Sequence, residues 1–346
     1  MYRLFVALTL AVGVGVPAHG QASADCFEQP DPRRTKSIHH YVFFGGDRER
    51  ITSDSGFLKS NTLEGAQIIY PWRRLEPRKD EYDFSPISED LAFLTSKGKK
   101  LWIQLQDVTF DESHIHVPRY LLDDPIYHGG AAKQYSIRGG GEANAVVAGW
   151  VARRWDPAVQ ERFQKLLSAL GKEFDGKIAG INLPETSIEF GESGRLFPDG
   201  FSFEAYRQAV PVNFKAMKLA FPKSVVMQYA NFMPGEWRPV DDKGYLRDIY
   251  LAATAAHVGL GGPDLMPHRE GQVKGSYPLI REAAGLVPTG IAVQDGNLEQ
   301  INPKTGRRVT TAELLEFAMQ CLRVDYIFWG TQEPYYSRDV IPAIRR

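Results

Sequence analysis

Short apolar runs alternate with longer amphipathic stretches along most of the chain. The runs are mostly continuous, which is typical of parallel strands covered on both faces. They predict strands at 39–44, 66–70, 100–106, 178–183, 225–229, 257–261, 290–294 and 326–329. The stretches between them predict helices at 85–96, 157–174, 203–220, 245–255, 277–285 and 311–323.

The clearest helix signal spans residues 157–174. Apolar side chains recur there at helical spacing, as one stripe made of Val159, Phe163, Leu166, Leu167 and Leu170. Asp156 precedes Pro157, so a capping side chain is followed by a proline at the first helical position. Both signals place the start of the helix at the same residue.

Eight strands that alternate with helices predict an α/β fold, a single (β/α)8 barrel over residues 25–346. A doubly wound open sheet is the alternative. It would place a glycine-rich phosphate turn after the first strand, and Gly45-Gly46-Asp47 does not make that turn. The chain exceeds the ~250 residues typical of the barrel, so we expect insertions. The longest, at 107–156, follows the third strand and leaves its carboxyl end.

Residues 1–24 read as a cleaved signal peptide. Arg3 precedes an apolar run at 4–16 that is too short to span a bilayer, and Ala22-Ser23-Ala24 gives the small-residue cleavage pattern. A membrane anchor is the alternative. We expect a secreted or periplasmic protein whose mature form does not enter the membrane. In that compartment Cys26 and Cys321 could form a disulfide, or they could be two unrelated thiols.

Composition narrows the class of ligand. The chain has 41 Lys+Arg against 42 Asp+Glu, a net charge of -1, which argues against a nucleic-acid binder. Two cysteines cannot build a four-thiolate metal site, and the sequence has no His-rich metal motif, so we expect neither metal nor cofactor. Aromatic residues make up 12% of the chain and serve either the core or a ligand platform.

In a barrel, chemistry is carried at the carboxyl ends of the strands. Here those ends hold mainly amides, carboxylates and aromatics, which suit a neutral ligand rich in hydroxyl groups. In strand order they are Tyr70, Trp72, Arg74; Gln104, Gln106, Asp107; Asn182, Glu185; Gln228, Tyr229, Asn231; Asp264, His268; Gln294, Asp295, Asn297; and Trp329, Gln332, Glu333. Trp150 lies in the long insertion. Trp72 is equally compatible with the core.

One segment resembles a known family. Residues 65–84, GAQIIYPWRRLEPRKDEYDF, are similar to the second-strand signature of retaining (β/α)8 glycoside hydrolases of clan A, the β-galactosidase and xylanase types. Residues 96–105 match the strand that follows in those enzymes, while Asp80 stands where the family usually has glycine. The resemblance is specific across the second and third β/α units and loose over the rest of the barrel.

The resemblance implies an acid/base glutamate after the fourth strand and a nucleophilic glutamate at the end of the seventh. Glu185 matches the first position, with the usual Asn-Glu pair spread out as Asn182-Leu-Pro-Glu185. The second position holds Asp295. Glu333, after the eighth strand, is the reserve carboxylate. Trp329 fits the tryptophan that forms the floor of the sugar subsite in many members of the clan.

These observations predict a glycoside hydrolase that acts on a poly- or oligosaccharide through two carboxyl groups, with retention as in the clan. Glu185 is the expected acid/base, since partial burial at a strand end raises a carboxyl pKa; a salt-bridged glutamate at a helix start is the alternative. Asp295, or Glu333, is the expected nucleophile or base, although Asp295 could be a turn residue. The expected substrate contacts are Tyr70, Trp72, Arg74, Gln104, Gln106, Trp150, Asn182, Tyr229, Asn231, Gln294 and Trp329.

Two other functions fit the same residues. A catalytically inactive barrel that only binds carbohydrate is favoured by the absence of a glutamate at the seventh strand end. A barrel lyase or transglycosidase would use the same strand ends for different chemistry.

Overall fold

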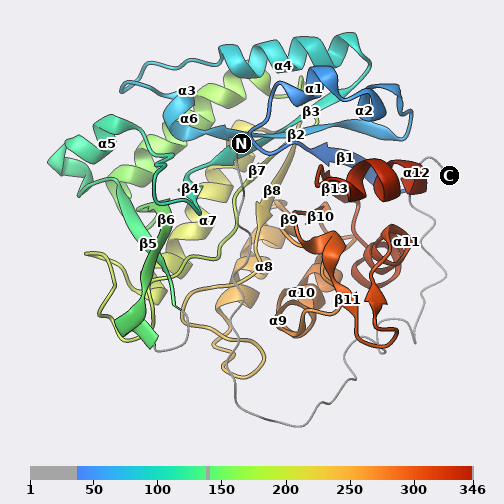
Figure 1. Ribbon diagram of the computed structural model, residues 1–346. Helices are drawn as coiled ribbons and strands as arrows, with labels where there is room; N and C mark the ends of the chain where they lie inside the picture. Colours follow the sequence, from blue (N-terminus) through green and yellow to red (C-terminus); the bar gives the residue numbers. More distant parts are fainter. Residues whose placement is uncertain (1–36, 138–140, 345–346) are drawn as a thin grey trace.

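Eight parallel strands close into a barrel in the computed structural model, which describes residues 37–137 and 141–344 (Figure 1). In chain order they are β1 (His39–Phe43), β2 (Leu63–Pro71), β3 (Lys100–Gln106), β7 (Gly180–Leu183), β8 (Val225–Tyr229), β9 (Gly259–Gly262), β10 (Thr289–Val293) and β13 (Tyr326–Gly330). Parallel pairing of β13 with β1, with Val42 opposite Trp329, closes the ring. The predicted (β/α)8 barrel is confirmed.

Helices cover the outside of the barrel (Figure 1). The main ones are α4 (Ser85–Ser96), α6 (Pro157–Phe174), α7 (Phe203–Ala220), α8 (Tyr245–Ala255), α10 (Ser276–Ala283) and α11 (Thr311–Glu316). The first four have the predicted bounds. The predicted 311–323 helix changes at residue 317 into a π-helical turn, η4 (Phe317–Leu322). Asp156 caps α6 as expected, since its side chain accepts hydrogen bonds from the amides of Ala158 and Val159.

Short elements fill the loops. They are α1 (Arg50–Ser53) and α2 (Ser55–Lys59) after β1, α3 (Trp72–Leu75) after β2, α9 (Glu270–Lys274) after β9, and η3 (Asn297–Glu299) with the hairpin β11 (Ile301–Asn302) and β12 (Arg307–Arg308) after β10. η5 (Tyr336–Val340) and α12 (Ile341–Ile344) follow β13. The loops that leave the carboxyl ends of the strands therefore carry most of the irregular structure.

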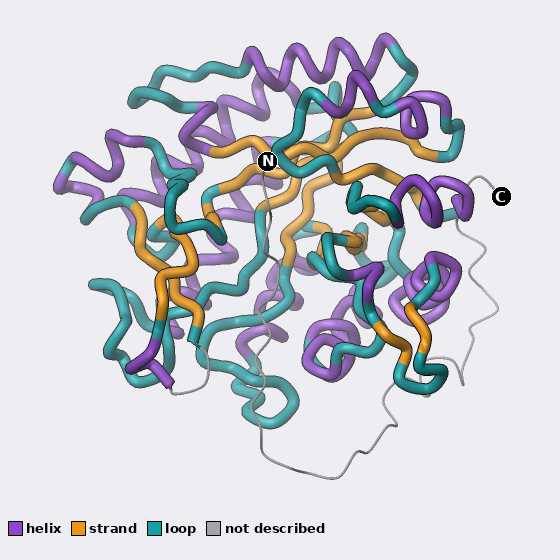
Figure 2. The backbone as a smooth tube through the Cα atoms, viewed as in Figure 1, coloured by secondary structure: helices purple, strands orange, loops and turns teal. Residues whose placement is uncertain are grey.

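The segment between β3 and α6 folds as a separate unit beside the barrel, which we call the excursion sheet (Figure 2). Its strands β4 (Val108–Thr109), β6 (Val146–Ala152) and β5 (Ala131–Ser136) pair antiparallel in that order. The connections hold α5 (Arg119–Asp123), η1 (Pro125–Tyr127) and η2 (Gly141–Asn144). At its base Arg154 forms a bidentate ion pair with Asp107, the first residue after β3.

Aromatic rings fill the interior of the barrel. Seven buried side chains form one cluster there: Tyr41, Phe43, Trp102, Met227, Tyr229, Ala292 and Phe328. The rings of Trp102 and Phe328 meet edge to face with their centroids 4.9 Å apart. Gly180 makes room for the indole, because a Cβ at that position would lie 2.7 Å from the Trp102 ring. The barrel is thus a packed core rather than a pore.

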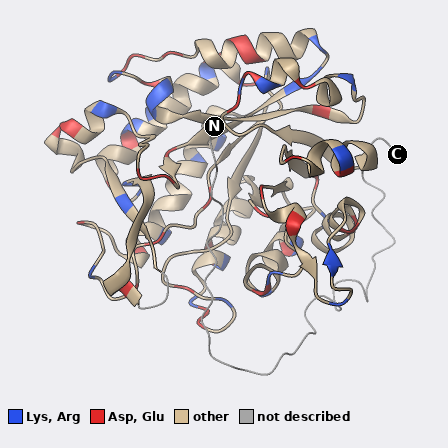
Figure 3. Cartoon of the chain, viewed as in Figure 1, with Lys and Arg blue, Asp and Glu red and all other residues tan. Residues whose placement is uncertain are grey.

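Charged residues are dispersed over the outer helices and loops, with both signs interspersed, while the barrel strands carry almost none (Figure 3). No helix in the described part of the chain is long and apolar enough to cross a bilayer. The predicted signal peptide at 1–24 and Cys26 lie outside the described residues. Cys321, the proposed partner of Cys26, is buried in η4.

The packed interior leads to a stability prediction. Phe328→Ala removes a fully buried ring from the barrel interior, so we expect it to lower the free energy of unfolding by about 3–5 kcal/mol. Leu219→Ala on α7, where the side chain is 84% exposed, serves as the control and should change it by less than about 0.5 kcal/mol. Urea denaturation measures both. Equal effects in the two variants would contradict the packing described here.

Candidate active site

Glu185 lies in the loop after β7, and its backbone is held from two sides. The Thr186 amide donates to the Tyr229 carbonyl at 3.1 Å, and the Thr186 hydroxyl donates to the Phe232 carbonyl at 2.6 Å. On the other side, the Arg154 guanidinium donates to the carbonyl of Glu185 itself at 3.0 Å. The loop is therefore anchored both to the residues that end and follow β8 and to the base of the excursion sheet.

The carboxyl group of Glu185 is partly buried and accepts a 2.5 Å hydrogen bond from the Asn231 side-chain amide. The pKa of Glu185 is raised from 4.5 to about 7, mainly by burial, and the negative charge of Asp264 contributes to the rise. The Asn231 hydrogen bond and the charges of Arg154 and Arg269 act in the opposite direction. Burial dominates, which matches the environment predicted for this glutamate.

Asp264 is the carboxylate whose charge acts on Glu185. It follows β9 in a left-handed conformation (φ 65°) and its side chain is buried. Asn297 donates to Asp264 Oδ1 at 3.0 Å, and an Arg269 nitrogen lies 3.5 Å from Oδ2. Burial raises the pKa of Asp264, while Asn297 and Arg269 oppose the rise. The sequence places Asp264 at a strand end but gives it no role, and it gives no sign of Arg269.

The fourth to seventh barrel strands thus bring four polar side chains to one rim of the barrel. Glu185 follows β7, Asn231 follows β8, Asp264 follows β9 and Asn297 follows β10. Hydrogen bonds join them in two pairs, Asn231 with Glu185 and Asn297 with Asp264. The two carboxyl groups are coupled by charge.

The two other predicted carboxylates lie in a different group, around Arg50 on α1. Glu333 has a 46% exposed side chain, and its carboxylate accepts from Arg50 at 3.2 Å and from the Ser337 hydroxyl at 2.7 Å. Asp295 is exposed and lies in a turn. Desolvation and the charge of Glu299 raise the pKa of Asp295, and Arg50 opposes them. Arg50, rather than Glu185, is therefore the charged partner that both carboxylates share.

Asn182 and Tyr229 lie in the barrel interior, where their polar atoms are hydrogen-bonded. Gln67 donates to Asn182 Oδ1 and to the Tyr229 hydroxyl, both at 2.9 Å, and the Trp102 indole donates to the same Asn182 oxygen at 3.0 Å. Gln67 was not identified from the sequence, because a single glutamine within a β-strand carries no motif. Asn182 and Tyr229, both predicted to contact substrate, therefore lie inside the barrel, below its rim.

Gln104 and Gln106 point to the same side of β3, one pleat apart. Gln104 donates to Gln106 Oε1 at 3.2 Å, and Gln106 donates to the Val108 carbonyl at 3.1 Å. The buried Oε1 atom of Gln104 has no hydrogen-bond partner among the described residues. Gln294, half-buried, bonds Asn297 Oδ1 through its backbone amide at 3.0 Å.

Three aromatic residues predicted to contact substrate lie instead in the core between the barrel and the helices. Tyr70, Trp72 and Trp329 are all at most 1% exposed. The Tyr70 hydroxyl donates to Asp90 on α4, the Trp72 indole donates to Glu76, and the Trp329 indole donates to His40. Strand alternation turns Tyr70 and Trp329 outward, and the continuous apolar runs of the sequence do not show which face a side chain takes.

The last two predicted contacts lie at the surface. Arg74 has a 55% exposed side chain and pairs with Asp83 at 2.5 Å, which fixes it beside α4. Trp150 is partly exposed on β6 of the excursion sheet. Its indole donates to the Glu112 carbonyl at 2.9 Å, and Lys133 lies over the ring, 5.5 Å from its centroid. Trp150 is therefore the predicted tryptophan with an accessible ring.

Comparison with known proteins supports the fold. No family model and no curated protein sequence matches the chain. The catalytic domain of beta-amylase from Paenibacillus polymyxa is similar in structure, with a TM-score of 0.56, 11% identity, and coverage of 86% of this chain and 92% of that one. This chain is a (β/α)8 barrel. At that identity the match establishes the fold alone.

Two further barrels align with lower TM-scores. GH10 from Paenibacillus barcinonensis gives 0.46 at 13% identity, over 85% of this chain and 84% of that one. Xylanase 10B from Thermotoga petrophila RKU-1, in complex with xylobiose, gives 0.48 at 10% identity, over 87% of this chain and 85% of that one.

Within residues 37–137 and 141–344 no group of three or more His, Cys, Asp or Glu is arranged to hold a metal ion.

The raised pKa of Glu185 makes a prediction that needs no substrate. A carboxyl whose folded-state pKa is raised stabilises the fold below its unfolded pKa, and that stability is lost as pH rises from 4.5 to about 7. Glu185→Gln cannot ionise and therefore does not lose this stability. When the pH is raised from 4.5 to 8, the free energy of unfolding of the variant should rise by on the order of 3 kcal/mol relative to that of the native chain. Urea unfolding at the two pH values measures this.

Glu204→Gln on α7 is the control. The pKa of Glu204 is lowered by its hydrogen bond with Arg207, so removing its charge should give no relative gain at alkaline pH. If Glu185→Gln behaves like Glu204→Gln, the carboxyl of Glu185 does not occupy the desolvated environment described above.

Proposed function

We propose that this barrel is a glycoside hydrolase in which Glu185 is the general acid/base and Asp264 is the second carboxylate. The observation that carries the proposal is the pair itself. Glu185 and Asp264 follow β7 and β9, which are separated by β8 alone; each carboxyl is desolvated, and the charge of Asp264 acts on Glu185. Cleavage of a glycosidic bond needs one carboxyl group that stays protonated and one that ionises.

Glu185 is suited to the acid role. With a pKa of about 7 it keeps its proton up to near neutral pH, and it can deliver that proton to the glycosidic oxygen as the bond breaks. The Asn231 amide fixes one carboxyl oxygen, Oε2, which leaves the other, Oε1, to hold the proton. The anchored backbone keeps this oxygen in place.

Asp264 is suited to the ionised role. Burial raises the pKa of Asp264, but Asn297 and Arg269 both favour its negative charge, and that charge in turn favours the protonated form of Glu185. As an anion, Asp264 either attacks the anomeric carbon or activates a water molecule. We place it ahead of Asp295 and Glu333, which share Arg50 as their charged partner.

A carbohydrate ligand also fits other features of the chain. Trp150 is partly exposed and offers an indole face for stacking. The similar structures are named as beta-amylase and xylanase, proteins that act on carbohydrate. The near-neutral charge of the chain suits an uncharged glycan.

The catalytic assignment is tested by three conservative variants. Glu185→Gln and Asp264→Asn should each lower kcat/KM by at least about 100-fold, because each removes a carboxyl group that acts on the reacting bond. Asp295→Asn is the matched control and should change it less than about tenfold. The measurement is release of new reducing ends from a panel of plant and bacterial polysaccharides.

The same assay separates the alternatives. Loss of activity in Asp295→Asn but not in Asp264→Asn would return the second role to Asp295. Products with an unsaturated end that absorbs in the ultraviolet would indicate a lyase. Binding of glycan without new reducing ends in the native chain would indicate a binding protein and overturn the proposal.

We also propose that the protein is exported, with residues 1–24 removed and Cys26 joined to Cys321. Expression with the native leader in a bacterial host should yield a periplasmic or secreted protein whose first residue is Asp25. Intact mass before and after reduction and alkylation tests both points. A retained leader, or alkylation of both cysteines without prior reduction, would contradict them.

A further inference from the structure

A buried ion pair joins the excursion sheet to the loop that carries Glu185. Arg154 donates from Nε to Asp107 Oδ2 at 2.8 Å and from a terminal nitrogen to Oδ1 at 2.6 Å. The side chains are only 7% and 3% exposed. Asp107 is the first residue of the segment that forms the excursion sheet, and Arg154 follows the last strand of that segment, β6. The ion pair therefore joins the two ends of the segment.

The other terminal nitrogen of Arg154 points at the catalytic loop. It donates to the Glu185 carbonyl at 3.0 Å and to the Tyr206 hydroxyl at 2.9 Å. That hydroxyl donates in turn to the Thr186 carbonyl at 2.9 Å. Two consecutive carbonyls of the loop, at Glu185 and Thr186, are therefore held by one guanidinium and the phenol bonded to it.

The charge of Arg154 also acts on Glu185. It opposes the rise in the pKa of Glu185, together with Arg269, while Asp264 adds to that rise. The charge of Glu185 also reaches Tyr206, where it is one of the smaller causes that raise the pKa of the phenol. Asp107 partly neutralises Arg154, since it lies in direct contact with the guanidinium.

Stability alone does not account for this arrangement. Burying two charges costs about as much as their attraction returns, and an apolar pair of similar size often gives an equally stable core. What an apolar pair could not supply is a rigid donor aimed at a carbonyl of the catalytic loop. The planar guanidinium bonds Asp107 with one edge and the loop with the other.

We propose that Arg154 is a positioning residue for Glu185, fastened by Asp107, and that it couples the excursion sheet to the catalytic loop. The inference rests on the proposed function of Glu185. A ligand that contacts the excursion sheet, for example at Trp150, would then bear on the position of Glu185 through this ion pair.

Titration of Glu185 is the readout that a purely structural role would not move. Glutamate carboxyls are labelled with carbon-13, and the Glu185 signal is assigned by its loss in Glu185→Gln. Arg154→Met removes the positive charge, so the pKa of Glu185 should rise by about one pH unit. Asp107→Asn leaves the charge of Arg154 uncompensated, so the pKa of Glu185 should fall. These opposite directions are the signature of the proposal.

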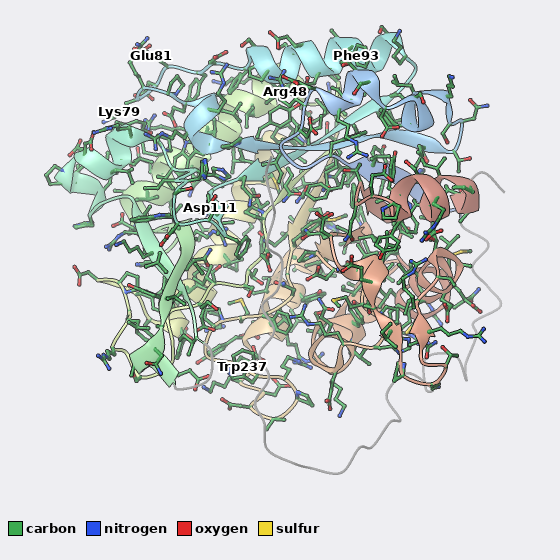
Figure 4. The ribbon with its side chains drawn as sticks, in the orientation of Figure 1. Arg48, Lys79, Glu81, Phe93, Asp111 and Trp237 are labelled. Carbon is green, nitrogen blue, oxygen red and sulfur yellow. The ribbon has the colours of Figure 1, made fainter. Side chains whose placement is uncertain are left out.

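The chain offers a matched control. Arg48 makes the same bidentate contact with Asp90, at 2.6 Å and 3.0 Å. This pair lies beside α1 and α4; Figure 4 labels Arg48 near the top of the molecule and Trp237 near the bottom. Arg48→Met should destabilise the protein and leave the titration of Glu185 unchanged. Arg154→Lys separates charge from geometry. It should keep the pKa of Glu185 near the native value, yet lower kcat about tenfold with KM unchanged, because lysine cannot bond Asp107 and the loop together.

The outcomes are distinct. An unchanged Glu185 titration in folded Arg154→Met or Asp107→Asn, or the same response in Arg48→Met, overturns the inference. If Arg154→Met does not fold, Asp107→Asn, which keeps the size of the side chain, decides alone. If the titration responds as expected but the native chain releases no reducing ends from any glycan, the proposed function fails while the link between Arg154 and Glu185 stands.

Discussion

Closure of the barrel by the pairing of β13 with β1 is the constraint on which the rest of the structure depends. Once the ring is closed, all eight strands run the same way and their carboxyl ends meet at one rim. Glu185 and Asp264 are 79 positions apart in the sequence numbering, yet they follow β7 and β9, with only β8 between those strands. The candidate active site is a consequence of closure, because no single segment of the chain contains it.

Desolvation at that rim gives the site its chemistry. A carboxyl in water ionises near pH 4.5, but burial next to a second carboxyl raises the pKa of Glu185 to about 7. The charges of Arg154 and Arg269 and the Asn231 amide limit that rise, while the Asn297 amide acts on Asp264. Each carboxyl accepts a hydrogen bond from one asparagine amide, but among the described residues only Asp264 has an arginine, Arg269, at ion-pair distance (3.5 Å). That difference favours the proton on Glu185 and the negative charge on Asp264.

The aromatic residues show how far a sequence pattern can be followed. The apolar runs locate the eight strands within a few residues, and four helices have the predicted bounds, because both depend on local periodicity and capping. The same runs do not show which face of a strand carries each ring. Tyr229 points into the barrel, while Tyr70 and Trp329 point to the helices, and no motif separates these positions. For the same reason Gln67 was missed.

By itself the sequence determined the (β/α)8 barrel, the long segment after the third strand and the candidate role of Glu185. Each follows from local signals: apolar periodicity, loop length, and a glutamate next to a strand end. Only the tertiary structure decided the partner of Glu185. Asp264 and Arg154 act on it through space, at a range set by barrel packing, and electrostatic coupling between strand ends has no signature in the order of residues. The tertiary structure was therefore needed to identify the second carboxylate and the ion pair between Arg154 and Asp107. It was also needed to show that Trp72 is buried in the core.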